Sequence, residues 1–209
     1  MNLRNLLDDN LDVSELKKIT GRPSVFNKPV IGISRDGIIN VPRADHVKTP
    51  DEFEPIAGAA EAVALMRQKG YRIVIFSNQY GISEGKLTQM DVDLVHERML
   101  NTFGDAGCPS IDGMYYSTTK MKEDMYAMPN IGMFHRAEKE MGVKFKEGWM
   151  VGDKISDIKA AQNIKSKPIL IKTGDYQDTL KKLDSWANTE LKKKVQIFDT
   201  LLDFAKSLD

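Results

Sequence analysis

Carboxylates, hydroxyls and amides follow three short apolar runs of the chain. These runs end in Ser34-Arg35-Asp36-Gly37, in Ser77-Asn78-Gln79 and in Gly152-Asp153-Lys154, and Asp157 follows the last of them by one helical turn. Carboxylate oxygens suit a hard cation, and hydroxyls with glycine-containing turns suit a phosphate group. Each signal alone is weak, because Asp-Gly also marks ordinary turns. Their shared position after apolar runs predicts one site for a phosphate and a cation.

An alternation of apolar runs and helical stretches predicts the elements that carry these residues. We expect strands at about residues 29–34, 72–77, 111–116, 148–152 and 168–171, and helices at about residues 58–68, 88–103, 133–141, 155–162, 176–183 and 201–207. Strands that alternate with helices form a parallel sheet covered by helices, and ligands bind beyond the carboxyl ends of its strands. The expected fold is therefore α/β and Rossmann-like, with about five parallel strands, helices on both faces and a minimal cap or none.

Composition excludes several classes of protein. The 209 residues include 30 basic and 30 acidic ones, and a formal net charge of +0 argues against a globally basic nucleic-acid binder. The single cysteine, Cys108, rules out an internal disulfide and a cysteine-built zinc site. No segment approaches the roughly 20 apolar residues of a membrane span, and the N-terminus lacks the apolar core of a signal peptide. The expected location is the cytoplasm.

The first 27 residues are expected to form a separate extension. Leucines recur there at helical spacing until Gly21-Arg22-Pro23 interrupts the pattern. This helix either packs on the main domain, residues 28–209, or offers a contact for a protein partner or for self-association.

The chain resembles the haloacid dehalogenase (HAD) superfamily over about residues 28–205. Within it, the similarity points to the branch of heptose bisphosphate and histidinol phosphatases, with polynucleotide 3′-phosphatase domains as near neighbours. The segments that carry the resemblance are Ser34-Arg35-Asp36-Gly37-Ile38-Ile39-Asn40, Thr49-Pro50-Asp51-Glu52-Phe53-Glu54, Phe76-Ser77-Asn78-Gln79-Tyr80-Gly81-Ile82, Pro129-Asn130-Ile131-Gly132-Met133 and Val151-Gly152-Asp153-Lys154-Ile155-Ser156-Asp157.

The resemblance implies phosphoryl transfer through an aspartyl-phosphate. In such enzymes one aspartate attacks phosphorus, a second aspartate two residues later acts as acid and base, and a lysine neutralises the developing charge. Position by position, Asp36 matches the acid/base residue, and Ser77 matches the hydroxyl that holds the phosphoryl group. Asp153 and Asp157, with Asp36, match the magnesium-binding positions. Asn78 and Lys154 are the further candidates for phosphate contacts.

Two positions depart from this pattern. Ser34 stands where the resemblance implies the nucleophilic aspartate, and Met128 stands where it implies the lysine. A serine needs a neighbouring base to attack, and the three histidines, at positions 46, 96 and 135, lie outside the motifs. Lysine at position 120, 122 or 154 is a candidate for supplying the missing positive charge.

These departures favour a degenerate phosphatase, or pseudoenzyme, with weak or no hydrolysis and a role in binding or scaffolding. The alternative is an active magnesium-dependent phosphomonoesterase that acts on a sugar phosphate or on a nucleic-acid 3′-phosphate. A weakened Mg²⁺ site is expected in either case, because one carboxylate is lost. No zinc is expected, since the chain lacks clustered cysteines and histidines.

Overall fold

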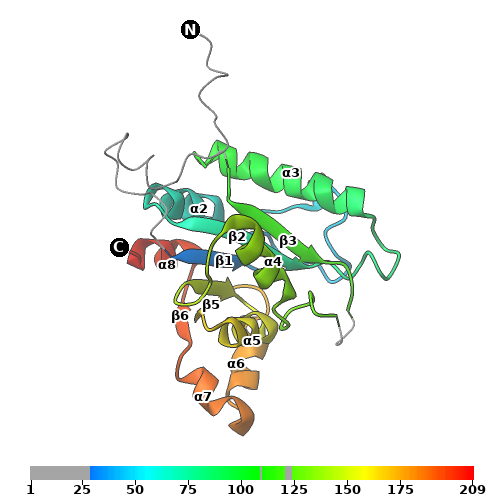
Figure 1. Cartoon of the computed structure of the whole chain (residues 1–209). Coiled ribbons are helices and arrows are strands. Elements are labelled where there is room, and N and C mark those ends of the chain that lie inside the picture. Colours follow the sequence, from blue (N-terminus) through cyan, green and yellow to red (C-terminus); the bar gives the residue numbers. More distant parts are fainter. Residues whose placement is uncertain (1–28, 109, 121–123) are drawn as a thin grey trace.

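The chain is described by a computed structural model that covers residues 29–108, 110–120 and 124–209 (Figure 1). The N-terminal extension predicted over residues 1–27, and Lys122, lie outside the described residues. None of the helices in the described ranges combines the length and apolar character that a membrane crossing requires.

A six-stranded parallel sheet forms the centre of the domain. Its strand order is β3-β2-β1-β4-β5-β6, and every neighbouring pair runs parallel. The strands are β1 Val30–Ser34, β2 Arg72–Asn78, β3 Gly113–Ser117, β4 Trp149–Gly152, β5 Lys167–Ile171 and β6 Gln196–Phe198. The predicted α/β class and parallel sheet are confirmed. The sixth strand was not expected, because β6 has three residues, two of them exposed, and such a segment carries no apolar run.

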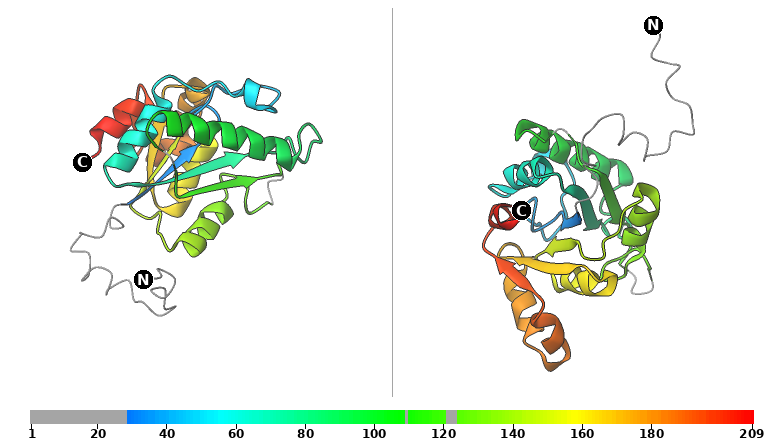
Figure 2. Two further views of the ribbon diagram at one scale, coloured as in Figure 1. Left: turned by 90° about the horizontal axis from the view of Figure 1, so that it is seen from above. Right: turned by 60° about the vertical axis from the view of Figure 1, so that its left-hand side comes forward.

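Helices cover both faces of the sheet (Figure 2). They are α2 Ala59–Gln68, α3 Gln89–Asp105, α4 Gly132–Met141, α5 Ile155–Ile164, α6 Tyr176–Leu183, α7 Thr189–Lys192 and α8 Leu201–Ser207, with 3-10 turns η3 Pro50–Glu52 and η4 Trp186–Asn188. Residues of α2, α3 and α8 share one apolar core, and residues of α4 and α5 share another on the opposite face. α6 and α7 pack beside β5 at the far end of the sheet (Figure 1).

Burial on both faces explains why β1 is apolar without interruption. All five of its residues are buried, as in a central strand of a parallel sheet. Ile31 and Ile33 belong to the first core, whereas Val30 belongs to the second. The ring of Phe76 in β2 packs on Phe134 of α4 with a centroid separation of 4.1 Å. The parallel register of β1 and β2, in which Ser34 lies opposite Phe76, holds their carboxyl ends side by side.

Connections at the carboxyl edge of the sheet are loops and short turns. In the described residues between β1 and α2, η3 is the helical segment, and those between β3 and α4 form no helix or strand. The described chain thus carries no cap domain in these connections, as the sequence predicts. The strand-end residues therefore face a cavity bounded by loops.

Candidate functional site

The carboxyl ends of β1, β2 and β4 surround a cavity of about 310 Å³, here called the strand-end cavity. Its lining comprises Ser34, Asp36, Ser77, Asn78, Tyr80, Met128, Lys154, Ser156, Asp157 and Asp175. The structure thus brings together all but one of the site residues predicted from the sequence. The exception is Asp153, which is fully buried behind the lining.

Asp36 is the acceptor of a dense set of hydrogen bonds. The guanidinium of Arg35 donates to it from Nη2 at 2.9 and 3.0 Å and from Nε at 3.2 Å. Asn40 donates at 3.0 Å, Ser77 at 3.2 Å and Gln79 at 2.8 Å. Burial by itself raises the pKa of Asp36, but the charge of Arg35 and the hydrogen bonds from Asn40 and Arg35 outweigh it, and the pKa falls to about 2. Asp36 is therefore ionised at neutral pH.

The ionised state of Asp36 bears directly on its predicted role. A general acid must hold a proton at the working pH, and efficient acids have pKa values near that pH. Asp36 has a much lower pKa and accepts hydrogen bonds through both oxygens. In this geometry Asp36 positions Ser77 and Gln79, and protonating it requires these bonds to be rearranged.

Asp153 and Asp157 form the acidic part of the site with a lysine between them. One Asp153 oxygen accepts a hydrogen bond from the backbone N–H of Asp175 at 2.8 Å, and Oδ1 has no hydrogen-bond partner among the described residues. Burial, followed by the charge of Asp157, raises the pKa of Asp153, and burial also raises the pKa of Asp157. Burial acts to lower the pKa of Lys154, but the carboxylates of Asp153 and Asp157 outweigh it and the pKa is raised.

This acidic cluster fits a divalent cation in part. The orphaned Oδ1 of Asp153 is a hard oxygen donor in a buried position, and a Cβ built on Gly37 would come within 2.2 Å of the Oδ2 atom of the same residue. Within the described ranges, however, no three His, Cys, Asp or Glu side chains are grouped to hold a metal. Mg²⁺ is commonly held by one or two carboxylates together with water and substrate phosphate. The residues therefore suit magnesium that arrives with, or is completed by, a phosphate ligand.

Ser34 and Met128 occupy the walls of the strand-end cavity. Ser34 ends the buried strand β1 and presents a neutral hydroxyl group. Met128 is 6% exposed, and its backbone is held by the side-chain amide of Asn78. Asn78 Nδ2 donates to the Met128 carbonyl at 3.1 Å, and the Met128 N–H donates to Asn78 Oδ1 at 3.0 Å. The predicted phosphate ligand Asn78 thus uses its amide to position this loop.

The lysines proposed as substitutes differ in position. Lys154 lines the strand-end cavity. Lys120 does not line this cavity. Its Nζ lies 4.5 Å above the Tyr80 ring and 3.4 Å from Oε1 of Glu84. Of the two, Lys154 is the cation that the structure places at the strand ends.

Several residues of the site were missed from the sequence. Arg35, Asn40 and Gln79 complete the hydrogen bonds of Asp36, and Asp175 lines the cavity after β5. Asp175 was detectable in principle, because it follows the fifth apolar run at the same edge of the sheet. His96, on α3, is not one of the lining residues, in agreement with its position outside the motifs.

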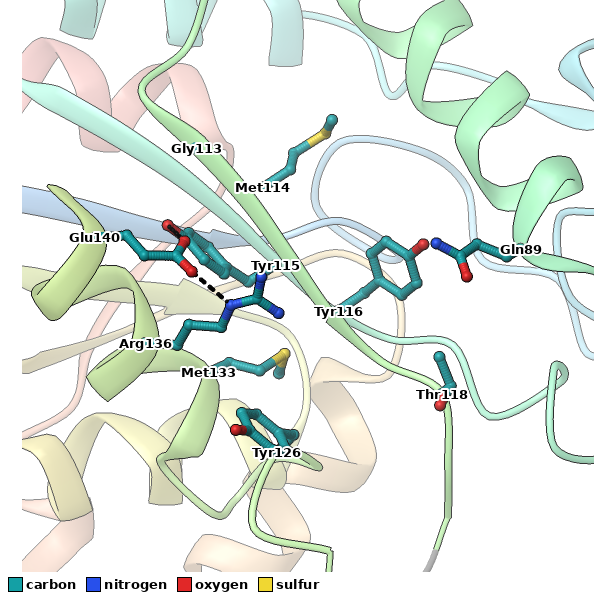
Figure 3. Close-up of a pocket in the computed structure, with 10 residues that line it drawn as sticks. All are labelled: Gln89, Gly113, Met114, Tyr115, Tyr116, Thr118, Tyr126, Met133, Arg136 and Glu140. Atoms are coloured by element: carbon teal, nitrogen blue, oxygen red, sulfur yellow. Dashed lines mark hydrogen bonds and ion pairs between the residues drawn. The ribbon is translucent and has the colours of Figure 1, made fainter.

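A larger cavity of about 530 Å³ lies along β3 and α4 (Figure 3). Tyr115, Tyr116 and Tyr126 line it, and Arg136 pairs with Glu140 at 2.8 Å. It contains none of the predicted site residues, so its size does not mark it as the chemical centre.

Comparison with known proteins identifies heptose bisphosphate phosphatases among the relatives of this chain. Residues 126–203 match a family model described as "HAD-hyrolase-like". The D-glycero-beta-D-manno-heptose-1,7-bisphosphate 7-phosphatase of Neisseria meningitidis is 34% identical over 178 residues, which cover 85% of this chain and 92% of the relative. The enzyme of the same name from Pseudomonas aeruginosa is 30% identical over 191 residues, covering 88% and 99%.

Solved structures agree with this similarity at the level of the fold. The D,D-heptose bisphosphate phosphatase from B. bronchiseptica, crystallised with magnesium and phosphate, has a TM-score of 0.77 at 23% identity. The alignment covers 86% of this chain and 97% of that structure.

Proposed function

Because the chain belongs to the HAD superfamily, in the branch of the heptose bisphosphate phosphatases, we propose that its strand-end cavity binds a phosphate monoester without hydrolysing it through an aspartyl-phosphate. The observation that carries the proposal is that Ser34 and Met128 both line the cavity. The two positions that depart from the family pattern therefore face the place where phosphate chemistry would occur.

Neither Asp36 nor His96 is suited to activate Ser34. An alkoxide nucleophile needs a neighbouring base of adequate strength. Asp36 has a pKa of about 2 and is saturated with hydrogen bonds, so it is a poor base. His96 has a pKa of about 3 and does not line the cavity. Covalent catalysis by Ser34 therefore has no proton acceptor in Asp36 or His96.

The binding function can persist without the covalent step. Lys154 lines the cavity as a cation, and Ser77 offers a hydroxyl held in place by Asp36 and Gln79. Magnesium bound beside Asp153 would neutralise part of the charge of a phosphate dianion. The protein's own contribution is then to orient the phosphate beside buried strand ends.

A second candidate is an active magnesium-dependent phosphomonoesterase. Its support is the identity of 34% to a relative that is named as a phosphatase. The site offers one feature in its favour, because the raised pKa of Asp157 makes this lining carboxylate a stronger base than Asp36. Direct attack by water would bypass the missing nucleophile.

A comparison of three proteins separates the two candidates. The full-length chain, a Ser34→Asp/Met128→Lys variant and a Ser34→Asn/Met128→Gln control are assayed with magnesium against a panel of phosphate esters. The control matches the sizes of the new side chains without their charges. Loss of one preorganised charge-stabilising group costs about 10² to 10³ in rate, so we expect turnover only in the Asp/Lys variant.

Binding is measured in parallel by titrating the unaltered chain with inorganic phosphate and magnesium. Saturable binding without turnover supports the proposal. Robust turnover by the unaltered chain would establish the phosphomonoesterase instead, and absence of phosphate binding would overturn the binding function itself.

A further inference from the structure

A second cavity, here called the side cavity, adjoins the strand-end cavity. Its volume is about 430 Å³, and its lining comprises Asn78, Tyr80, Thr119, Lys120, Ala127, Met128, Pro129 and Asn130. Asn78, Tyr80 and Met128 line both cavities. A phosphate ester held at the strand ends therefore has the side cavity next to it as room for its organic group.

Most of the contact surface of the side cavity is apolar. The Tyr80 ring, Ala127, Met128 and Pro129 supply carbon and sulfur atoms. The amide groups present are already used within the protein. Asn78 bonds both backbone groups of Met128, and Asn130 donates to the backbone carbonyl of Asp124 at 2.8 Å.

Positive charge at the side cavity is weak. Among its described lining residues, Lys120 is the cation, and its side chain is 69% exposed. Its ammonium group lies 3.4 Å from Glu84 and above the Tyr80 ring. An exposed ion pair contributes little binding energy, and the charge of Lys120 is already partly neutralised by Glu84. The described lining residues therefore offer a second phosphate group few interactions in place of the water molecules that it would lose on binding.

Hydrogen bonds within the protein hold the loop that forms the apolar wall. The Ala127 N–H donates to the Asp124 carbonyl at 3.1 Å, and the Asn130 N–H donates to the Ala127 carbonyl at 2.9 Å. Asn163 of α5 donates to the Pro129 carbonyl at 3.0 Å. A wall that is already ordered loses little conformational entropy on binding, which favours affinity.

We infer that the side cavity selects phosphate monoesters whose organic group is aromatic and uncharged, in preference to sugars that carry a second phosphate. The inference rests on the phosphate-binding function proposed above and names the ligand class of that site. Methionine sulfur and tyrosine rings make favourable contacts with aromatic groups. Among its described residues, the same wall offers a second phosphate group only Lys120, which already pairs with Glu84.

The test measures affinity for three probes on the full-length chain with magnesium. Calorimetric titrations with inorganic phosphate, phenyl phosphate and fructose 1,6-bisphosphate report the preference directly. Phenyl phosphate should bind about tenfold more tightly than either of the others. Equal or tighter binding of the bisphosphate would overturn the inference, and so would equal binding of phenyl phosphate and inorganic phosphate.

A charge-placing variant gives a second, independent measurement. Met128→Lys puts an ammonium group at the shared wall and should shift the preference toward the bisphosphate by about tenfold or more. Met90→Lys is the matched control, because Met90 lies on α3, is 72% exposed and lines neither cavity. An equal shift in both variants would refute the assignment to the side cavity.

The outcomes keep this inference separate from the proposed function. Phosphate released during the titrations would show turnover and contradict the non-hydrolytic proposal, while kcat/KM for the phosphate esters would still rank their organic groups. Inorganic phosphate binding without a gain from the phenyl ring would overturn the inference alone. Absence of binding by all three probes would overturn both.

Discussion

A buried histidine should make the free energy of unfolding of this protein decrease as the pH falls, and one substitution can isolate that contribution. His96 lies on α3, is 4% exposed, and its Nε2 atom has no hydrogen-bond partner among the described residues. Its ring contacts the ring of Tyr116 at a centroid distance of 5.5 Å. Burial and then the charge of Arg35 lower the pKa of His96 to about 3. The imidazole is therefore neutral in the folded protein.

The size and sign of the effect follow from proton linkage. An unfolded histidine has a pKa of about 6.5, so the unfolded chain takes up a proton first as the pH falls. Stability contributed by the neutral imidazole is present above pH 6.5 and is lost progressively between about pH 6.5 and pH 3. At about 1.4 kcal/mol per pH unit, the loss between pH 7 and pH 5 amounts to about 2 kcal/mol.

Asp153 acts in the opposite direction over the same range. Its pKa is raised in the fold, so the folded state takes up that proton before the unfolded state does, and stability increases as the pH falls. The raised pKa of Asp157 acts in the same direction as that of Asp153, so the unaltered chain shows the sum of opposed contributions. Only a comparison with a variant that lacks the histidine isolates the effect of His96.

The assay is urea unfolding followed by far-ultraviolet circular dichroism at pH 7 and pH 5. The free energy of unfolding of His96→Gln minus that of the unaltered chain should be about 2 kcal/mol larger at pH 5 than at pH 7. His135→Gln is the control, because the His135 side chain is 62% exposed on α4. If His96→Gln and the unaltered chain respond equally to the change of pH, the buried neutral state of His96 is refuted.

Three further results are expected. Gly37→Ala should lower the free energy of unfolding, measured by thermal denaturation, by about 3 kcal/mol or more, because Gly37 has φ +92° and a new Cβ would overlap the Asp153 carboxylate. The control Gly85→Ala should cost about 1 kcal/mol, because Gly85 has φ +69° but open space around it. Equal costs would show that this close approach is not tight. Phe134→Ala should cost about 3–5 kcal/mol in urea unfolding, since the ring is fully buried, and a cost below 1 kcal/mol would contradict its place in the core. Magnesium should strengthen the binding of inorganic phosphate to the unaltered chain, and Asp153→Asn should reduce that enhancement about tenfold or more. Titrations with and without magnesium measure both effects, and a phosphate affinity that is independent of magnesium would contradict the cation site.

Much of the fold was predictable because its signals are local. α6 and α8 were predicted with their observed bounds, and α2 within one residue. The sixth strand was missed because β6 is short and largely exposed, so its order depends on pairing with β5. The strand-end rule located the site, since parallel strands bring their carboxyl ends to one edge whatever their spacing along the chain.

The sequence by itself determined which chemical groups are available. Ser34 and Met128 stand at the two positions where the resemblance implies a carboxylate and an amine, and the chain has a single cysteine. Folding cannot change the side chains at these two positions, although it can bring another cation such as Lys154 to the cavity. The proposed loss of covalent hydrolysis therefore depends on the identities of the residues at these two positions.

Only the tertiary structure decided the state of these groups. The low pKa of Asp36 depends on its neighbour Arg35, and also on Asn40 and on the more distant Lys154. The use of the Asn78 amide on a loop 50 residues away, and the side cavity that this loop forms, have no counterpart in any motif. The physical reason is that burial and hydrogen bonding arise between residues distant in the chain, and these fix protonation and cavity shape.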